Sequence, residues 1–429
     1  MASNVKHPAT GLDRQIAPLA LLLMGAQLPI ALGVSTMTAV VVALLPVTLP
    51  VVLSSRPGRV ATLLTLLAVG NGLWLSMVSD RPINTSNAVF MAILLVSGYG
   101  LYATVLWSSR VIGTGRSAVW FCIGLLVPLV AGIITFEENA WKYGYSLPVA
   151  ALVCVLFSRQ RAIVQVLGVL IVGLLGAFLE SRSFFAICLA TVAIYLYSSR
   201  KKGTTGRSRA NRLRPILVLS FTFVGIYIAG TRLFSGGYLG DGAQAVTAGQ
   251  LADGRSLLVT ARPEWFATFS LMEEYPWGMG IGTIPTLKDY LTAAKGLADV
   301  GIDAGGPYYT DYLFGGHFKL HSVLADLWVN FGVFGLVTGL TITGVILFGL
   351  LRETAGGRPS TLAIFASLSA LWFVFFGPIM SNFAWVMFAL AVAHARISAE
   401  HSQDGGERLG PYDARDPSLV SARSRLDGV

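Results

Sequence analysis

The sequence predicts an all-α, polytopic integral membrane protein with about twelve transmembrane helices and a large, partly helical extracytoplasmic loop between helices 9 and 10. Of the 429 residues, 54% are hydrophobic and only 12% are charged, about half the charged share of a soluble domain. Many apolar runs approach the ~20 residues of a bilayer-spanning helix. Lys and Arg are dispersed between these runs, so the net charge of +9 is typical of basic membrane loops and does not indicate a nucleic-acid partner.

Twelve apolar runs are candidate transmembrane helices. The first shows no cleavage site and a second run follows at once, so we expect a retained helix and not a signal peptide. The tenth is the longest, and we expect it to tilt or to extend beyond the bilayer. The runs are 16–34, 36–53, 60–78, 88–107, 118–135, 145–158, 162–179, 183–198, 214–231, 320–350, 361–377 and 380–396.

The connections between the runs predict the orientation. If the N-terminal segment 1–15 lies inside, every short inside connection carries Lys or Arg, whereas outside connections read SDRPINTSN or FEENAWKYGYS. This alternation holds through all twelve runs, as the positive-inside rule requires. We therefore expect a membrane domain over 16–397 with both termini in the cytoplasm. The polar tail 398–429 has the composition of a disordered segment.

One outside connection, 232–319, is much longer than the loops that usually join helices. It is rich in glycine, charge and aromatic residues, and the stretch LLVTARPEWFATFSLMEEY within it has helical apolar spacing. The glycine-rich PWGMGIGT that follows lacks the strand and helix that flank a phosphate-cradling loop. We expect a tight turn there, in a loop that is ordered in part and covers the outer end of the helices.

A histidine stands at the head of the tenth run, HSVLADLWVNFGVFG. Its ring can take up a proton near neutral pH, which suits a general base, although a histidine at a helix end is commonly a structural hydrogen-bonding group. His321 lies near Lys319 and is followed by Ser322. Asp326 and Asn330 are four residues apart and so share a helical face, and an intramembrane carboxylate should face the bundle interior or a wet cavity.

Three arginines on the outside are candidate anion ligands. Arg182, close to Glu180 in LESRSFF, lies at the end of a span, where snorkelling to the interface is the alternative. Arg255 and Arg262 lie seven apart in DGRSLLVTARPEW and would share one face if the segment were a continuous helix, although Pro263 argues against that helix. Two solvated loop arginines are the alternative. Because guanidinium groups bind phosphate oxygens in bidentate fashion, three of them suit a diphosphate.

The cysteines do not indicate metal or disulfide chemistry. All 3 lie singly within apolar runs, and no metal-ligand spacing occurs. No HExxH, GxSxG or P-loop pattern is present. The residues therefore predict neither a metal nor another cofactor.

The order of these motifs supports a family assignment. SRS at the start of a span is followed by a long outer loop with GR and RPEW, then by EEYPWGMGIGT and HSVLADLWVNFGVFG. Over 165–345 this order resembles the bacterial O-antigen ligase and O-antigen polymerase family. The family hallmark is His, then Asn, Ser or Gln, nine residues, and Gly-x-x-Gly. His321 and Ser322, nine residues, and Gly332 and Gly335 fit it.

The resemblance implies an activity and a location. Members of the family are glycosyltransferases of surface-polysaccharide biosynthesis in the cell envelope. They transfer a glycan from an undecaprenyl-diphosphate carrier to an acceptor on the outer side of the bacterial cytoplasmic (inner) membrane, without nucleotide or metal. The implied partners are this lipid-linked donor, a glycan, lipid or protein acceptor, and membrane lipids.

The resemblance also implies residue roles. His321 would deprotonate the acceptor, and Arg182 would hold the donor diphosphate. The loop arginine maps either to Arg255, which follows the usual glycine, or to Arg262, which has Trp265 at the better distance. The resemblance therefore makes both Arg255 and Arg262 candidate ligands of the diphosphate.

One position departs from the family pattern. Asn330 stands where the family often has a carboxylate, two residues before the first motif glycine. Asp326 is the candidate substitute, and Lys319 and Ser322 are candidate supporting residues.

Several functions stay open on the sequence. The acceptor is a lipopolysaccharide core, the growing end of a polysaccharide or a protein side chain, which corresponds to a ligase, a polymerase or a protein O-oligosaccharyltransferase. A transporter or lipid flippase is the alternative of another class, and it predicts broken helices, mid-bilayer charges and two related halves. Few charges lie within the spans. A scaffold without chemistry is disfavoured by the Arg and His residues gathered at the outer face.

Overall fold

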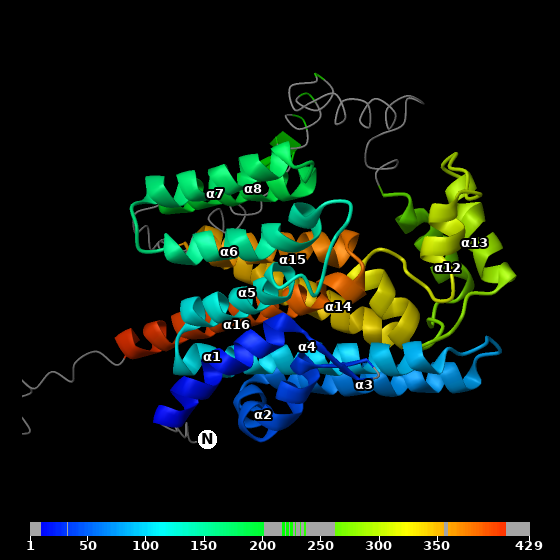
Figure 1. Cartoon of the computed structure of the whole chain (residues 1–429), viewed down its shortest axis with the longest axis horizontal. Coiled ribbons are helices and arrows are strands. Elements are labelled where there is room, and N and C mark those ends of the chain that lie inside the picture. The colour runs from blue at the N-terminus through cyan, green and yellow to red at the C-terminus, as the bar shows by residue number, and fades with distance from the viewer. Residues whose placement is uncertain are drawn as a thin grey trace, which may run out of the picture.

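The structure, a computed structural model, describes residues 10–31, 33–200, 262–355 and 359–408, with scattered positions between 217 and 236 (Figure 1). In this part of the chain the regular structure is helical except for one short antiparallel hairpin of β1 (Pro29–Ala31) and β2 (Val34–Ser35) and an isolated bridge. The prediction of an all-α protein is confirmed.

The helices follow one another through short connections. In the first 200 residues they are α1 (Gly11–Ala26), α2 (Thr36–Leu53), α3 (Arg56–Val78), α4 (Thr85–Val111), α5 (Thr114–Val130), the π-helix η1 (Trp141–Tyr145), α6 (Ser146–Leu156), α7 (Ala162–Phe178) and α8 (Arg182–Ser199). Later in the chain they are α12 (Glu264–Glu274), α13 (Leu287–Ala298), the π-helix η2 (Tyr308–Leu313), α14 (Val323–Ala355), α15 (Thr361–Phe376) and α16 (Ile379–Arg408).

Six of these helices are long and apolar enough to cross a membrane: α2, α3, α4, α8, α14 and the Ile379–Ile397 part of α16. The apolar helices α5, α6 with η1, α7 and α15 are shorter. The chain is therefore a multi-pass membrane protein by the length and composition of its helices. That the chain has twelve spans stays a prediction. The ninth run, 214–231, falls largely outside the described residues.

The predicted runs match the helices closely, with one correction. The first run was expected to be helical over 16–34, but α1 ends at Ala26 and the hairpin follows. Gln27 takes a left-handed conformation (φ 48°) and donates its N–H to the carbonyl of Leu23, which closes the helix. Pro29, two residues further on, cannot continue a helical hydrogen-bond ladder.

One end of the bundle carries the elements that form the candidate site. Figure 1 shows α12 and α13 together beyond the end at which α3 and α4 meet, and α14 begins on the same side. We call this end the loop end. Residues 264–313 are helical in three stretches, α12, α13 and η2. That this segment lies outside the membrane stays a prediction.

A break in α14 shapes the loop end. Gly332 has φ 64° and ψ −151°, so α14 consists of a short half, 323–331, and a long half, 333–355. This backbone conformation is open to glycine and strained for any L side chain. A Cβ at Gly332 would also lie 2.3 Å from Nδ2 of Asn71 and 2.5 Å from the carbonyl oxygen of Trp277.

The glycine-rich turn of PWGMGIGT fills this break. The N–H groups of Met279 and Gly280 donate to the carbonyl of Val329 at 2.9 and 3.1 Å. Nδ2 of Asn71 in α3 donates to the carbonyl of Phe331 at 2.9 Å. These bonds satisfy backbone groups that the break releases, as irregular backbone inside a membrane bundle requires.

A second contact fixes α13 to the α3–α4 turn. Arg81 donates to both carboxylate oxygens of Asp289 at 2.9 and 2.7 Å, and its guanidinium lies 4.4 Å from the ring centroid of Tyr275. Asp289 is fully buried and also accepts from Thr286. Burial alone would raise the pKa of Asp289, but the bonds from Arg81 and Thr286 hold it below its usual value.

We expect Arg81→Ala to lower the free energy of unfolding by about 3 kcal/mol, because it leaves a buried carboxylate without its cation. Thermal unfolding of the purified protein in detergent measures this as a lower Tm. The control is Lys288→Ala, which removes the ion pair with Glu274. The two side chains are 69% and 44% exposed, so water screens the pair and its loss should change the Tm little. Equal losses for the two variants would contradict the role given to Arg81.

We also expect Gly332→Ala to lower the yield of folded protein and its Tm, because the new Cβ meets Asn71 and Trp277 and forces a left-handed alanine. Gly344→Ala in the same helix is the matched control, since its Cβ would meet nothing within 4 Å. Size-exclusion elution and Tm in detergent compare the two. A Gly332→Ala protein as stable as the control would argue against the break.

Candidate functional site

His321 lies at the loop end, immediately before α14. It is one of the few described residues other than glycine with a left-handed backbone (φ 54°), a strained conformation that is often tied to function. The buried carboxylate of Asp326 holds the backbone here. Its two oxygens accept the N–H groups of Leu320, at 2.8 Å, and of Ile379 at the start of α16, at 2.9 Å.

Ser322 fixes the other side of the histidine. Its hydroxyl accepts from the N–H of Ala325 at 3.2 Å and donates to the carbonyl of Val374 in α15 at 2.8 Å. Asn330 donates to the carbonyl of Asp326 at 2.9 Å. Ser322 and Asp326, predicted as supporting residues, are thus buried and bonded to backbone groups. Their hydrogen bonds fix the backbone on both sides of His321. The imidazole ring of His321 is therefore the candidate acid–base group.

Two tyrosines of η2 stand behind the histidine ring. The hydroxyl of Tyr312 lies 3.3 Å from Nδ1 of His321. The ring of Tyr308 stacks on that of Tyr312, with centroids 5.4 Å apart and planes 13° apart. Tyr308 in turn donates a short hydrogen bond to the carboxylate of Glu264, which is only 5% exposed. Residue type and spacing alone did not reveal these residues, although two tyrosines four apart in PYYTDY share one helical face.

Three cations lie near the histidine and the two tyrosines, and each of the three lies against an aromatic ring. Within the part of the chain that the structure describes, none of the three forms an ion pair with a carboxylate. A cation held by rings retains N–H groups for an anionic ligand. The three are Arg262, 5.4 Å from the Trp372 ring and 5.3 Å from the Phe376 ring; Lys319, 5.1 Å from the Tyr312 ring; and Lys142 of η1, 4.9 Å from the Tyr143 ring.

The electrostatics of the site favour a neutral histidine. Burial lowers the pKa of His321 below its usual value. The negative charge of Glu264 raises this pKa, whereas the charges of Arg262 and Lys142 lower it further. His321 is therefore unprotonated at neutral pH, the state that a general base requires.

Arg262 is fixed by an aromatic cluster at the end of α15. Nε1 of Trp265, three residues after Arg262, donates to the carbonyl of Phe375 at 2.9 Å. This bond holds the start of α12 against the residues that stack on the guanidinium. Of the two predicted loop arginines, Arg262 thus lies at the site, and Arg255 lies outside the described residues.

Arg182 lies at the start of α8, which packs against η1. It follows Glu180, which has a left-handed backbone (φ 57°), and Ser181. Phe184, two residues after Arg182, packs edge-on against Trp141 with centroids 6.2 Å apart. Trp141 precedes Lys142, whose charge acts on His321. The start of α8 therefore packs against η1, the element that carries Lys142.

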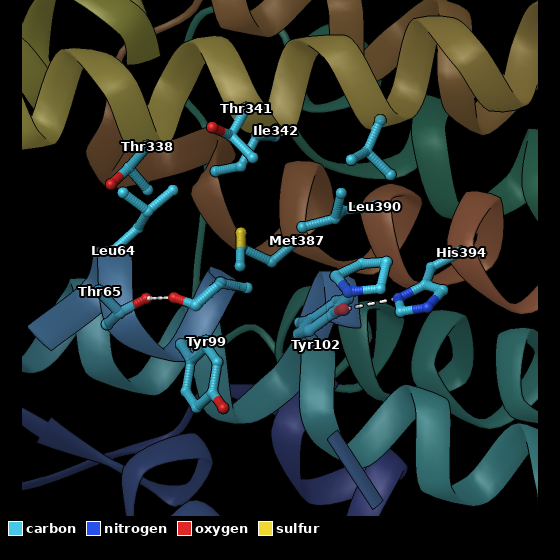
Figure 2. Close-up of a pocket in the computed structure, with 13 residues that line it drawn as sticks. Leu64, Thr65, Tyr99, Tyr102, Thr338, Thr341, Ile342, Met387, Leu390 and His394 are labelled. Carbon is cyan, nitrogen blue, oxygen red and sulfur yellow. Dashed lines mark hydrogen bonds between the residues drawn. The ribbon is translucent and has the colours of Figure 1, made fainter. Parts of the chain in front are cut away.

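A pocket lined by other residues lies between α3, α4, α14 and α16 (Figure 2). Its lining is mostly aliphatic, and its main polar feature is a hydrogen bond of 2.6 Å between the hydroxyl of Tyr102 and Nδ1 of His394. His394 lies fifteen residues beyond Ile379, about 22 Å along α16 at ~1.5 Å per residue. Other residues that line the pocket are Leu64, Thr65, Thr338, Thr341, Met387 and Leu390.

The remaining polar candidates do not form a metal centre. Among the described residues no group of three His, Cys, Asp or Glu side chains is arranged to hold a metal ion. Cys122, Cys154 and Cys188 are buried free thiols.

Comparison with known proteins does not extend these findings: no family model, no curated protein and no solved structure matches the chain. The function is therefore argued from the site. The structure brings His321, Lys319, Ser322, Asp326 and Arg262 together.

Proposed function

We propose that this protein transfers a glycan from an undecaprenyl-diphosphate carrier to an acceptor on the outer side of the bacterial cytoplasmic membrane. The single observation that carries the proposal is a half-buried, backbone-strained histidine beside three cations with no carboxylate partner in the described part of the chain, at one end of an apolar helical bundle. A base next to an anion site suits displacement of a phosphate leaving group.

The reaction follows from the positions of these groups. His321 takes the proton of the acceptor hydroxyl while the acceptor oxygen attacks the anomeric carbon of the donor sugar. The bond from that carbon to the diphosphate oxygen breaks, and its electron pair leaves on the diphosphate. Arg262, Lys319 and Lys142 stabilise this developing charge, and the imidazolium then releases its proton to water.

Arg182 is proposed as a further ligand of the diphosphate. Its place at the start of α8, which packs against the η1 element that carries Lys142, supports this assignment. In this account the polyprenyl chain stays in lipid beside the helices, and the sugars lie beneath α12, α13 and η2. The predicted orientation with both termini in the cytoplasm places this end outside, as the positive-inside alternation favours.

The proposal has three forms, which differ in the class of acceptor. A surface-polysaccharide ligase or repeat-unit polymerase is our preferred form, and a protein O-oligosaccharyltransferase uses the same chemistry. Each form has a hydroxyl acceptor that a histidine can deprotonate, so the site residues keep the same roles in all three.

A transporter or lipid flippase is the second candidate, and two observations favour it. α14 is broken at Gly332, and the buried Tyr102–His394 pair lies deep in the bundle, as transport mechanisms often require. The released carbonyls of α14, however, are bonded to the glycine-rich turn and to Asn71 and are therefore not free to bind a substrate. We therefore place transfer first.

We expect His321→Gln to reduce transfer at least ~100-fold, because glutamine cannot accept the acceptor proton. The assay incubates purified protein with an undecaprenyl-diphosphate oligosaccharide and candidate acceptors and identifies products by mass. His394→Gln, in the pocket between α3, α4, α14 and α16, is the matched control and should retain activity. Full activity of His321→Gln, or loss confined to His394→Gln, would count against transfer at this site.

We expect Arg262→Lys and Arg182→Lys each to lower kcat by about tenfold or more, because a point charge lacks the bidentate fork. Arg116→Lys, at an exposed arginine of α5, is the control. The same mass-based assay, run over a range of donor concentrations, separates kcat from KM. An unchanged rate for Arg182→Lys would return that residue to an interfacial, snorkelling role.

A further inference from the structure

A row of three side chains extends from His321 into the loop-end elements. Tyr312 contacts the imidazole at Nδ1, Tyr308 stacks on Tyr312, and Glu264 accepts the hydroxyl of Tyr308. The two tyrosines come from η2 and the carboxylate from α12. The proposed transfer reaction needs one free ring nitrogen as the base and assigns no role to this row.

A histidine base depends on the partner of its second nitrogen. In a neutral imidazole one nitrogen carries the proton and the other is free to accept one, and the hydrogen bond at one side sets the tautomer. If Nδ1 donates its N–H to the oxygen of Tyr312, the lone pair of Nε2 is free to face the acceptor. The opposite tautomer would leave no base on the acceptor side.

The charge that forms on the ring also needs compensation. His321 becomes an imidazolium when it takes up the acceptor proton. The charged groups that act on it are Glu264 from α12, Arg262 from the segment before α12, and Lys142 from η1. Lys319 lies on its own segment, against Tyr312, and the oxygens of Asp326 are engaged by two backbone amides.

Glu264 is thus the carboxylate available to offset these cations. It is nearly buried and fixed by Tyr308, so its charge is weakly screened. A buried carboxylate that orients and compensates a histidine base is an established catalytic arrangement. Here the carboxylate acts through two stacked tyrosines.

We propose that Tyr312 and Glu264 are positioning residues for His321, an inference that rests on the proposed transfer function. Tyr312 accepts the N–H of Nδ1 and directs the lone pair of Nε2 to the acceptor. Glu264 holds Tyr312 in place through Tyr308 and stabilises the imidazolium. The proton moves from the acceptor oxygen to Nε2, and no proton leaves Nδ1 during transfer.

The first test is the pH profile of kcat/KM for Tyr312→Phe and Glu264→Gln. Wild-type kcat/KM rises with pH through the pKa of His321, since the neutral ring is the base. Glu264→Gln keeps an acceptor for Tyr308 but removes the charge that raises this pKa, so the acid limb should move down by about 0.5–1 pH unit. Tyr312→Phe should lower kcat about five- to tenfold, as expected for one lost hydrogen bond, with KM within about twofold.

Matched variants separate positioning from general damage. Tyr309→Phe removes the hydroxyl of the neighbouring tyrosine and should keep both the rate and the acid limb of wild type. Tyr308→Phe keeps the stacked ring but breaks the bond to Glu264, and should lower kcat. It also serves as the second variant if Glu264→Gln folds poorly, as judged by elution and Tm.

A second measurement does not depend on catalysis. Diethyl pyrocarbonate modifies neutral imidazoles, and mass spectrometry of peptides reports the modification rate of His321 at each pH in the full-length protein. The titration of this rate should shift down in Glu264→Gln and stay at the wild-type position in Tyr309→Phe.

The two measurements distinguish the possible failures. A wild-type acid limb and titration in Glu264→Gln, or wild-type kcat in Tyr312→Phe, would overturn the positioning proposal while leaving transfer intact. Absence of transfer by the wild-type protein would overturn the proposed function, and the modification titration would then decide whether Glu264 sets the pKa of His321.

Discussion

The buried carboxylate of Asp326 is the contact on which the candidate site depends. It joins three segments of the chain, because it belongs to α14 and accepts one amide from the residue before His321 and one from the start of α16. A carboxylate with both oxygens hydrogen-bonded to backbone is well satisfied in an apolar interior. It thereby holds His321 in a left-handed conformation that the chain would otherwise avoid. The hydroxyl of Ser322 adds a bond to α15, so the histidine is fixed to the helices and not carried on a free loop.

The break in α14 determines where Asp326 lies. The short half of α14 carries Asp326 and begins two residues after His321, and Gly332 ends it. The glycine-rich turn and Asn71 satisfy the carbonyls that the break releases. The same turn continues into α13, which Arg81 fixes to the α3–α4 turn through Asp289. Through these contacts α12 and η2 acquire fixed places beside His321, and with them Arg262, Glu264 and the two tyrosines.

The sequence predicted much of the fold and part of the site, for identifiable reasons. Apolar runs reveal helices because burial in lipid is a property of each run alone, so most helix boundaries were predicted within a few residues. The end of α1 was missed because it depends on the left-handed Gln27 and the hairpin. His321 and Arg262 stood out by residue type and spacing. Tyr312, Glu264 and Lys142 did not, because their proximity to the histidine arises from packing between distant segments. Glycine spacing indicated a motif at Gly332, but only the contact with Asn71 and Trp277 explains the break.

The central claim is that His321, anchored by Asp326, faces the diphosphate of a lipid-linked donor. The most direct measurement is an experimental structure of the protein in a lipid nanodisc with undecaprenyl diphosphate bound. The account predicts the diphosphate within hydrogen-bonding reach of Arg262 and Arg182, with the His321 ring beside it. A diphosphate bound in the pocket of Tyr102 and His394, or at the loop end but away from His321, would contradict it.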